Sequence, residues 1–412
     1  MKMFQTAALG TAFAVLAGTT ALADCGIGAG NVSVIGNDFP AIHAIIDAAK
    51  ACEIDGLTVT ANLTEEHQTL NVPGMTGDPA EYSVAVIANS SIVALLNDGL
   101  IRPLDDLIAQ YAPDLPNLNR VTVDGQVMAV AFMANAQHLF VRSDVLEAAG
   151  VAIPTTFEDV LVAAEAIRAA GIMEHPVALN TGAGWNLGEE FINMYMGTGG
   201  ELFEAGTAMP TIENEQGLAA LNMLKSLTEY SNPDFLTFDS NATQALWEAG
   251  DVALAMMWGS RGTAVLDDEG SSSDIVSTTV LTAAPSFGGN ATPATTLWWD
   301  GFAIASNVSD EDAATSFQAM MIGIGSDVVE ANQDASVWLS SAYVATPASA
   351  GVIASAQAGA TPYPMLPYVG LMHSALGDNL AEFLQGSESA EQALADVTAA
   401  YMTAAREQGF VQ

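Results

Sequence analysis

Two adjacent tryptophans followed by an aspartate lie in the stretch TTLWWDGFAIAS, residues 295–306. An indole offers a flat apolar face for the C–H face of a sugar ring, and a carboxylate accepts hydrogen bonds from sugar hydroxyls. Trp298, Trp299 and Asp300 therefore supply both halves of a carbohydrate site. Successive side chains of a strand point to opposite faces, so we expect one tryptophan to pack in a core and the other to be free to face a ligand. Plain core packing is the alternative, because tryptophan is mostly buried without any ligand.

No pattern typical of catalysis or of cofactor binding stands beside this stretch. The sequence has no glycine-rich phosphate loop, no His-Glu-x-x-His pair, no Cys-x-x-Cys pair and no serine nucleophile elbow. The five histidines are scattered without a second ligand at metal spacing, and we expect His43 and His373 on helix surfaces. With 48 acidic residues, close carboxylates arise by chance and give no argument for a glycosidase. We expect no cofactor, no metal and no enzymatic activity.

The first 23 residues are typical of an export signal. A single charge, Lys2, precedes an apolar run that ends in Ala21-Leu22-Ala23, a small-x-small cleavage pattern. Cys25 follows Asp24 and not the small residue that lipidation requires, so we expect a soluble product that begins near Asp24. No other apolar run approaches the about 20 residues of a membrane-spanning helix. The mature chain is expected outside the cytoplasm.

The charge of the chain excludes whole classes of partner. It has 9 Lys and Arg against 48 Asp and Glu, a net charge of −39, and removal of Lys2 makes the mature chain more acidic still. Such a charge argues against nucleic acid and anionic membrane surfaces, and it describes a solvated acidic coat without naming a ligand. The two cysteines, Cys25 and Cys52, are expected to form a disulfide in an oxidising compartment.

The elements that must position these residues alternate between strand and helix. Residues 31–36 and 57–63 predict strands on either side of a helix at 40–52, and a buried strand at 82–89 leads into a helix at 90–99. This order favours an α/β fold with a mostly parallel sheet and crossover helices. A chain of 412 residues exceeds what one hydrophobic core usually organises, so we expect two lobes.

Five segments in a fixed order resemble one known family. The longest is DGQVMAVAFMANAQHLFVRSDVLEAAGVAIPTTFEDVLVAAEAI at 124–167, and the others lie at 86–108, 182–203, 246–260 and 282–306. Together they resemble the extracellular solute-binding proteins of ABC importers, in particular the carbohydrate-binding group that includes maltose-binding protein. The resemblance covers essentially the whole mature chain. It departs from many relatives in the run FVR at 140–142, where a YYN-like run is common.

The resemblance implies the type II periplasmic-binding-protein fold: two lobes, each a mixed sheet flanked by helices, with a ligand cleft between them. Lobe 1 would comprise residues 24–134 and 286–340, and lobe 2 residues 135–285 and 341–412. The chain would cross between the lobes near 131–137, 282–287 and 340–347. Closure of such a hinge requires a ligand that contacts both lobes.

The resemblance also places site residues at strand ends and on the crossings. The expected ligand contacts are Asn37, Asp38, Glu66, Asn89, Ser90, Asn135, Gln137, Trp185, Asn186, Trp258, Ser260, Arg261, Trp298, Trp299, Asp300 and Tyr368. Several have a structural alternative. Asn37 and Asp38 are also good loop caps, Asn89 and Ser90 are good helix N-caps, and Glu66 is typical of a solvated helix start. Tyr368 can equally pack in the core.

The implied function is that of a monomeric periplasmic protein that binds a neutral sugar or polyol and delivers it to an inner-membrane ABC permease. Arg261 leaves the charge of the ligand open, because it can hold a carboxylate, phosphate or sulfonate on the ligand or pair with a neighbouring carboxylate. A binding protein for an anionic sugar derivative, a sensor-type receptor of the same fold and a secreted glycoside-acting enzyme are the alternatives.

Overall fold

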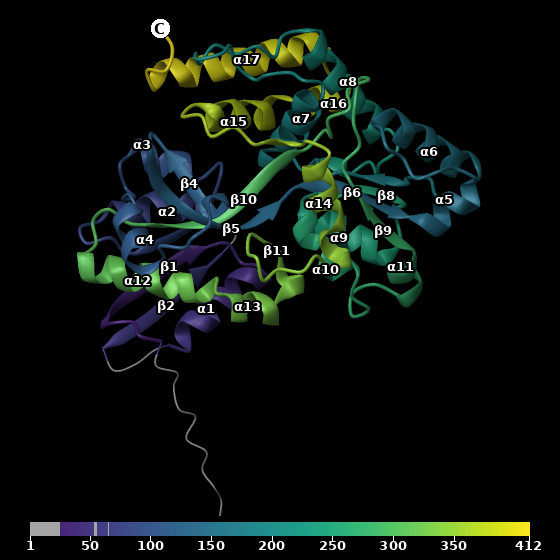
Figure 1. The fold of residues 1–412 in the computed structure, drawn as a ribbon. Coiled ribbons are helices and arrows are strands. Elements are labelled where there is room, and N and C mark those ends of the chain that lie inside the picture. The colour runs from purple at the N-terminus through teal and green to yellow at the C-terminus, as the bar shows by residue number, and fades with distance from the viewer. Residues whose placement is uncertain (1–24, 53–55, 65) are drawn as a thin grey trace, which may run out of the picture.

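The computed structural model describes residues 25–52, 56–64 and 66–412, so the predicted export signal at 1–23 lies outside the described residues. The described chain forms two α/β lobes, each built on its own sheet (Figure 1). The disulfide between Cys25 and Cys52 is confirmed, with the two Cα atoms 5.6 Å apart.

The sheet of lobe 1 places the first strands of the chain beside a strand from its second half. Its order is β11 (Val337–Trp338), β5 (Gln126–Asn135), β10 (Thr296–Ile304), β3 (Val84–Ala88), β1 (Gly30–Gly36) and β2 (Leu57–Leu63). β4 (Arg120–Val123) pairs with β5, and β12 (Thr361–Pro362) pairs with β10. β1 is parallel to β2 and β3, as predicted, whereas β10 runs antiparallel to both β3 and β5.

The sheet of lobe 2 is smaller. Its order is β7 (Val177–Ala178), β8 (Leu254–Trp258), β6 (Gln137–Arg142) and β9 (Thr279–Thr282). β6 is antiparallel to both neighbours, and β7 is parallel to β8. All six residues of β6 are buried, because helices cover both faces of this sheet.

Helices flank both sheets (Figure 1). Lobe 1 holds α1 (Pro40–Lys50), α2 (His67–Thr76), α3 (Ile92–Asn97), α4 (Asp105–Tyr111), α12 (Asp310–Gly323) and α13 (Ser326–Ala331), with the short 3-10 turns η1 (Asn117–Asn119) and η4 (Gln333–Ala335). Lobe 2 holds α5 (Ser143–Ala149), α6 (Phe157–Ala169), α7 (Trp185–Gly197), α8 (Glu215–Thr228), α9 (Ser240–Ala249), α10 (Gly262–Val265), α11 (Ser273–Thr278), α14 (Ala350–Gln357), α15 (Val369–Asn379), α16 (Ala381–Leu384) and α17 (Ala390–Glu407), with η2 (Phe235–Thr237), η3 (Gly259–Arg261) and η5 (Pro347–Ser349).

Local sequence signals set several of these boundaries. α1 buries a stripe of alanines and isoleucines at helical spacing against the lobe 1 core. α6 begins at a capping box, in which the Thr156 hydroxyl accepts a hydrogen bond from the Asp159 backbone N–H and the Asp159 side chain accepts one from Thr156. Gly171 follows this helix with a φ of 68°, which favours glycine.

The chain passes between the lobes at three places. The first passage is at Ala136, between β5 and β6. The second lies inside β10, later than the predicted range 282–287, because Phe287, Ala294 and Trp298 pack into the lobe 2 core while Phe302 packs into that of lobe 1. Residues 286–298, which the resemblance assigns to lobe 1, therefore pack with lobe 2. The third passage follows β11, whose Trp338 is in the lobe 1 core.

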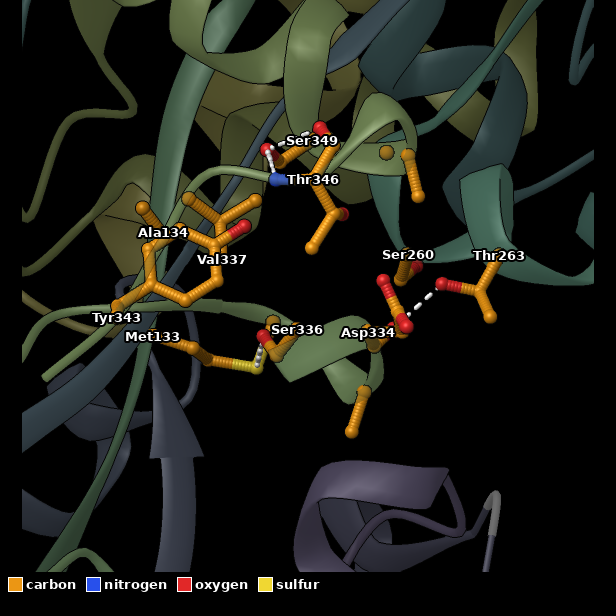
Figure 2. A pocket seen from close by; sticks show the side chains of 13 residues that line it. Met133, Ala134, Ser260, Thr263, Asp334, Ser336, Val337, Tyr343, Thr346 and Ser349 are labelled. Atoms are coloured by element: carbon orange, nitrogen blue, oxygen red, sulfur yellow. Dashed lines mark hydrogen bonds between the residues drawn. The ribbon is translucent and has the colours of Figure 1, made fainter. Parts of the chain in front are cut away.

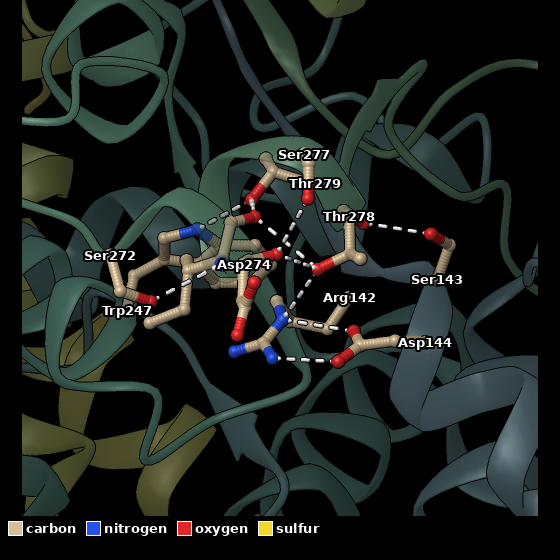
Figure 3. A network of polar contacts seen from close by, with 10 residues as sticks. Arg142, Ser143, Asp144, Trp247, Ser272, Asp274, Ser277, Thr278 and Thr279 are labelled. Atoms are coloured by element: carbon tan, nitrogen blue, oxygen red, sulfur yellow. Dashed lines mark hydrogen bonds and ion pairs between the residues drawn. The ribbon is translucent and has the colours of Figure 1, made fainter.

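A network of polar contacts lies at the end of β6 in lobe 2 (Figure 3). Arg142 is 8% exposed, and its guanidinium donates to both carboxylate oxygens of Asp144, at 3.0 and 2.8 Å, and to the Thr278 hydroxyl. The fully buried Trp247 donates its indole N–H to Thr279. The residues FVR at 140–142, which differ from those of many relatives, are therefore buried and bonded at the end of β6.

Within the described ranges 25–52, 56–64 and 66–412, no helix has the length and apolar character that a membrane span requires.

Candidate ligand-binding site

A cavity of about 430 Å³ lies between the two lobes. Lobe 1 and its passages contribute Asn37, Asp38, Phe39, Pro40, His67, Gln68, Ala88, Met133, Asn135 and Asp300, and lobe 2 contributes Trp185, Asn186, Asp239, Ser240, Asn241, Trp258, Ser260, Arg261 and Trp298. The volume is within the range of small-molecule sites, and the lining combines aromatic rings with many hydrogen-bonding groups. We call this cavity the cleft.

Three tryptophans from different elements meet on the lobe 2 side of the cleft, and we call them the aromatic wall. Trp185 opens α7, Trp258 ends β8 and Trp298 lies on β10. Their ring centroids are 5.6 to 6.3 Å apart, with the rings tilted or edge to face. Trp185 is 38% exposed and Trp298 only 6%, so the wall has an open outer ring and a nearly buried inner one.

The lobe 1 side of the cleft is built from the carboxyl ends of strands, which is where open α/β sheets bind ligands. Asn37 and Asp38 follow β1, and Ala88 ends β3. The Asn37 side chain accepts a hydrogen bond from the Asp38 backbone N–H, and a carboxylate oxygen of Asp38 lies 2.6 Å from Nε2 of His43. Asn37 is therefore a cleft residue that also bonds within its own loop, and the N-cap residue of α1 is Phe39.

The floor of the cleft lies on the first passage. The Asn135 side-chain oxygen accepts hydrogen bonds from the backbone N–H groups of Ala136 and Ser260, at 3.0 and 3.2 Å. Asn135 therefore ties β5 of lobe 1 to η3 of lobe 2 at the point where the chain crosses.

A second, much smaller pocket of about 10 Å³ adjoins the floor (Figure 2). There the Thr263 hydroxyl of α10 donates to the backbone carbonyl of Asp334 in η4, which joins the two lobes behind the cleft. The pocket has room for about one water molecule, so it is not the solute site.

Asp300 stands out among the polar groups of the cleft. It lies opposite Ala88 and Met133 in the sheet register, and both of these residues also line the cleft. Among the described residues, none donates a hydrogen bond to its carboxyl group. Desolvation by the surrounding protein raises the pKa of this carboxyl to about 7. An acceptor without a partner on a cavity floor is suited to a ligand hydroxyl.

Arg261 lines the cleft but is engaged by the protein. Its guanidinium donates to the side-chain oxygen of Gln244 at 3.2 Å. Three carboxylates, those of Asp38, Asp239 and Asp300, line the same cavity. The Asp239 carboxylate caps α9 by accepting from two backbone N–H groups. The charge of the cleft is therefore acidic, which opposes an anionic ligand.

Ten of the sixteen predicted contacts line the cleft: Asn37, Asp38, Asn135, Trp185, Asn186, Trp258, Ser260, Arg261, Trp298 and Asp300. Whether they touch a ligand stays a prediction.

The other six predicted contacts do not line the cleft, for identifiable reasons. Glu66 is exposed at the start of α2. Asn89 is buried, and its amide donates to the Leu297 carbonyl and accepts from the Trp299 backbone N–H. The Ser90 hydroxyl is buried beside it.

The remaining three contact other parts of the protein and not the cleft: Gln137, Trp299 and Tyr368. Gln137 is 1% exposed, and its side chain interacts with the carboxyl group of Glu190, whose pKa it lowers. Trp299 points to the opposite face from Trp298 and packs on the lobe 1 core. The Tyr368 hydroxyl donates to the Thr207 carbonyl, and its ring packs on Phe203.

Other cleft residues were not predicted from the sequence. Phe39, Pro40, Gln68 and Met133 line the cleft, as does the Asp239–Asn241 turn. Nothing in their sequence context separates them from ordinary loop and cap residues. His373, expected on a helix surface, is 2% exposed and stacks on Trp185 with ring centroids 4.6 Å apart. The sequence of α15 is apolar on most sides of the helix, and this pattern indicates that the helix, including His373, is buried.

Two lobes joined by three passages, with a cavity of aromatic and polar residues between them, are the architecture of a two-lobed binding protein. The sequence profile of the bacterial extracellular solute-binding proteins matches residues 64–327, and the chain belongs to that family. The substrate-binding role of the family is therefore the role of this chain, in an exported setting with which the disulfide agrees.

Solved structures of the same fold support the architecture. Maltose-bound MalE3 of T. maritima superposes with a TM-score of 0.79 at 16% identity, covering 91% of this chain and 100% of that one. A solute-binding protein of Agrobacterium radiobacter K84 in complex with ribitol gives 0.77 at 17% identity, covering 91% and 98%. One of Agrobacterium vitis S4 with bound D-mannitol gives 0.76 at 19% identity, covering 92% and 99%. A comparison with curated protein sequences found no match.

Proposed function

We propose that the chain is the periplasmic substrate-binding component of an ABC importer for a neutral sugar or polyol. The observation that carries the proposal is the aromatic wall of Trp185, Trp258 and Trp298, which lines the same cavity as the unpartnered carboxyl group of Asp300. Flat rings beside hydrogen-bond acceptors complement the apolar and hydroxyl faces of a carbohydrate. Structures of similar fold hold maltose, ribitol and D-mannitol, which is consistent with this class.

The proposed contacts fall into two groups that meet across the cleft. On lobe 2, Trp185, Asn186, Trp258, Ser260 and Trp298 form the stacking side, with Arg261 at its edge. On lobe 1 and the floor, Asn37, Asp38, Asn135 and Asp300 supply polar partners. A solute that touches both groups stabilises the closed arrangement of the lobes by its differential affinity, and the three passages act as the hinge.

The neutral class is favoured over the anionic one by the state of Arg261. Its guanidinium is bound by Gln244, and three carboxylates share the cavity with it. A phosphate or carboxylate on the ligand would meet net repulsion there. Catalysis is not part of the proposal, because the chain belongs to a family of solute-binding proteins.

Delivery to an inner-membrane permease and a monomeric state complete the proposal, and membership of the family supports the permease as the partner. A sensor-type receptor of the same fold would share the cleft and differ only in its partner. Transport assays in a strain that lacks the chain separate these two roles, since only an importer component restores uptake of the sugar.

A thermal-shift screen of the mature chain tests the class of solute. The panel contains maltose, ribitol, D-mannitol and their phosphate or acid derivatives. A ligand at 100 times its dissociation constant adds about 2.7 kcal/mol to the free energy of unfolding, which is a clear rise in melting temperature. The proposal predicts a rise with at least one neutral compound. A rise with anionic derivatives alone would refute the neutral class and bring Arg261 into the site.

A further inference from the structure

Trp298, the inner ring of the aromatic wall, is held by a buried polar cluster behind the cleft. Its indole N–H lies 2.9 Å from the Thr296 hydroxyl oxygen and 3.1 Å from a carboxyl oxygen of Glu189 on α7. Its ring packs on Tyr363 with centroids 4.3 Å apart, and on Trp185 and Trp258. Glu189 is fully buried and does not line the cleft.

The hydrogen atoms available in this cluster show which form of Glu189 fits. The Thr296 hydroxyl oxygen lies 2.7 Å from the same carboxyl oxygen of Glu189 and 2.8 Å from the side-chain oxygen of Asn193. The Asn193 atom is an acceptor, because it also receives the Thr296 backbone N–H at 2.7 Å. A hydroxyl carries one hydrogen and cannot donate to both acceptors at once.

A protonated Glu189 resolves this conflict. Its O–H donates to the Thr296 oxygen, the Thr296 O–H donates to Asn193, and the Trp298 N–H also donates to the Thr296 oxygen. If Glu189 is ionised, the Thr296 hydrogen goes to the carboxylate, and the oxygens of Thr296 and Asn193 face each other at 2.8 Å without a proton. Thr296 is two residues before Trp298 on β10, so a shift that relieves this contact moves the indole.

The surroundings of Glu189 also favour the neutral acid. Burial raises the pKa of its carboxyl to about 8, against the lowering effect of the hydrogen bonds from Thr296 and Trp298. The titratable groups that face it are Glu190 on the same helix, Tyr363 after β12 and His373 on α15. Burial lowers the pKa of His373 to about 4, so this imidazole supplies no compensating positive charge near neutral pH. Burial raises the pKa of Tyr363 well above its usual range, so its phenol stays neutral.

We propose that Glu189 is a positioning residue that holds Trp298 in the aromatic wall while its carboxyl carries a proton, so that the cleft loses affinity for its solute in alkaline solution. The binding half of this proposal rests on the proposed function, and the structural half does not.

Glu190 provides a matched control for every test. It is the next residue of α7, it is 3% exposed, and burial raises the pKa of its carboxyl to about 8 as well. Its carboxyl accepts the backbone N–H of Asn180 and makes no hydrogen bond to Trp298. Glu189→Gln keeps a hydrogen-bond donor for Thr296 and cannot ionise. Glu190→Gln removes a buried carboxyl group with a similar pKa that does not contact Trp298.

The first test uses the chain without any sugar. Near-ultraviolet circular dichroism of the tryptophan bands is followed from pH 6.5 to 9.5 for the wild type and both variants. We expect a transition with a midpoint near pH 8 in the wild type and a flat signal in Glu189→Gln. Glu190→Gln should keep the transition with a lower midpoint, because the charge of Glu190 no longer raises the pKa of Glu189. A transition that persists in Glu189→Gln, or that Glu190→Gln abolishes equally, overturns the proposal.

The second test follows binding, with D-mannitol and maltose as probes. If only the form with protonated Glu189 binds, this titration raises the apparent dissociation constant about tenfold between pH 7 and pH 9 in the wild type. Glu189→Gln lacks this rise and shows only the gain of at most about twofold in affinity that ionisation of Asp300 gives both proteins. A flat wild-type profile refutes the proposal even where the sugar binds well. Absence of binding of either probe at pH 7 counts against the proposed function and leaves the circular dichroism result to decide on Glu189.

A third measurement needs no Glu189 variant to fold. The indole N–H resonance of Trp298, assigned by its loss in Trp298→Phe, is followed by NMR in the wild-type chain labelled on tryptophan. We expect this resonance to shift with a midpoint near pH 8 while that of the distant Trp247 stays constant. A Trp298 resonance unchanged from pH 7 to 9.5 contradicts the proposal.

Discussion

The two buried acids of α7 are expected to make the free energy of unfolding of the chain fall as pH rises through the neutral range. Glu189 and Glu190 are both buried, and burial raises the pKa of each carboxyl to about 8, from 4.5 in an unfolded chain. Between these values the folded state holds a proton on each acid that the unfolded state has released. The free energy of unfolding therefore decreases with pH in this window, and the loss is complete above about pH 8.

The size of this effect follows from the number of protons. Each acid binds one proton more in the folded state than in the unfolded state inside the window, so together they lower the free energy of unfolding by about 3 kcal/mol per pH unit. Glu189→Gln should remove one of the two contributions. Denaturant unfolding at pH 5.5, 6.5 and 7.5 measures the slope, and the exposed Glu174→Gln is the control for a change of net charge. Equal slopes for the wild type and Glu189→Gln would refute the reasoning.

Three further predictions concern the cleft and the disulfide between Cys25 and Cys52. Trp185→Ala should weaken sugar binding by about 1–3 kcal/mol in isothermal titration, and Trp299→Phe, outside the cleft, should leave it unchanged. Asp300→Asn should cost about 1.5–3 kcal/mol of affinity. It should also abolish a loss of affinity that the wild type shows as pH falls through about 7, where the ionised acceptor becomes protonated. Cys25→Ser should lower the free energy of unfolding by about 3–4 kcal/mol, measured by denaturant titration under oxidising conditions. Equal stability of the wild type and Cys25→Ser would show that the disulfide does not stabilise the chain.

Much of the fold is readable from local signals. The strand-helix-strand order at 31–63, the capping box at Thr156 and the disulfide each depend on neighbouring residues or on compartment chemistry, which a sequence displays directly. Polar residues after β1 and on the first passage also line the cleft as expected. These positions follow from the rule that ligands bind at the carboxyl ends of strands in open α/β sheets.

The site itself depends on tertiary contacts that the alternation of side chains along a strand does not predict. Strand geometry predicts that Trp298 and Trp299 face opposite ways, but the choice between them is set by pairing of β10 with β5 and by the position of the second passage. Asn89 has the composition of a ligand contact, yet its amide is used to join β10 to the end of β3. Glu189 and Glu190 resemble surface acids in the sequence, and tertiary packing of α7 buries both. Glu189 meets Thr296 and Trp298 of β10, and Glu190 meets Asn180.

A crystal structure of the mature chain with the neutral compound that raises its melting temperature most tests the central claim directly. The account predicts one molecule between the lobes, with a carbon face against Trp185, Trp258 or Trp298 and a hydroxyl donating to the Asp300 carboxylate. A sugar bound elsewhere on the surface, or a cleft occupied through Arg261 by an anionic compound alone, would contradict it.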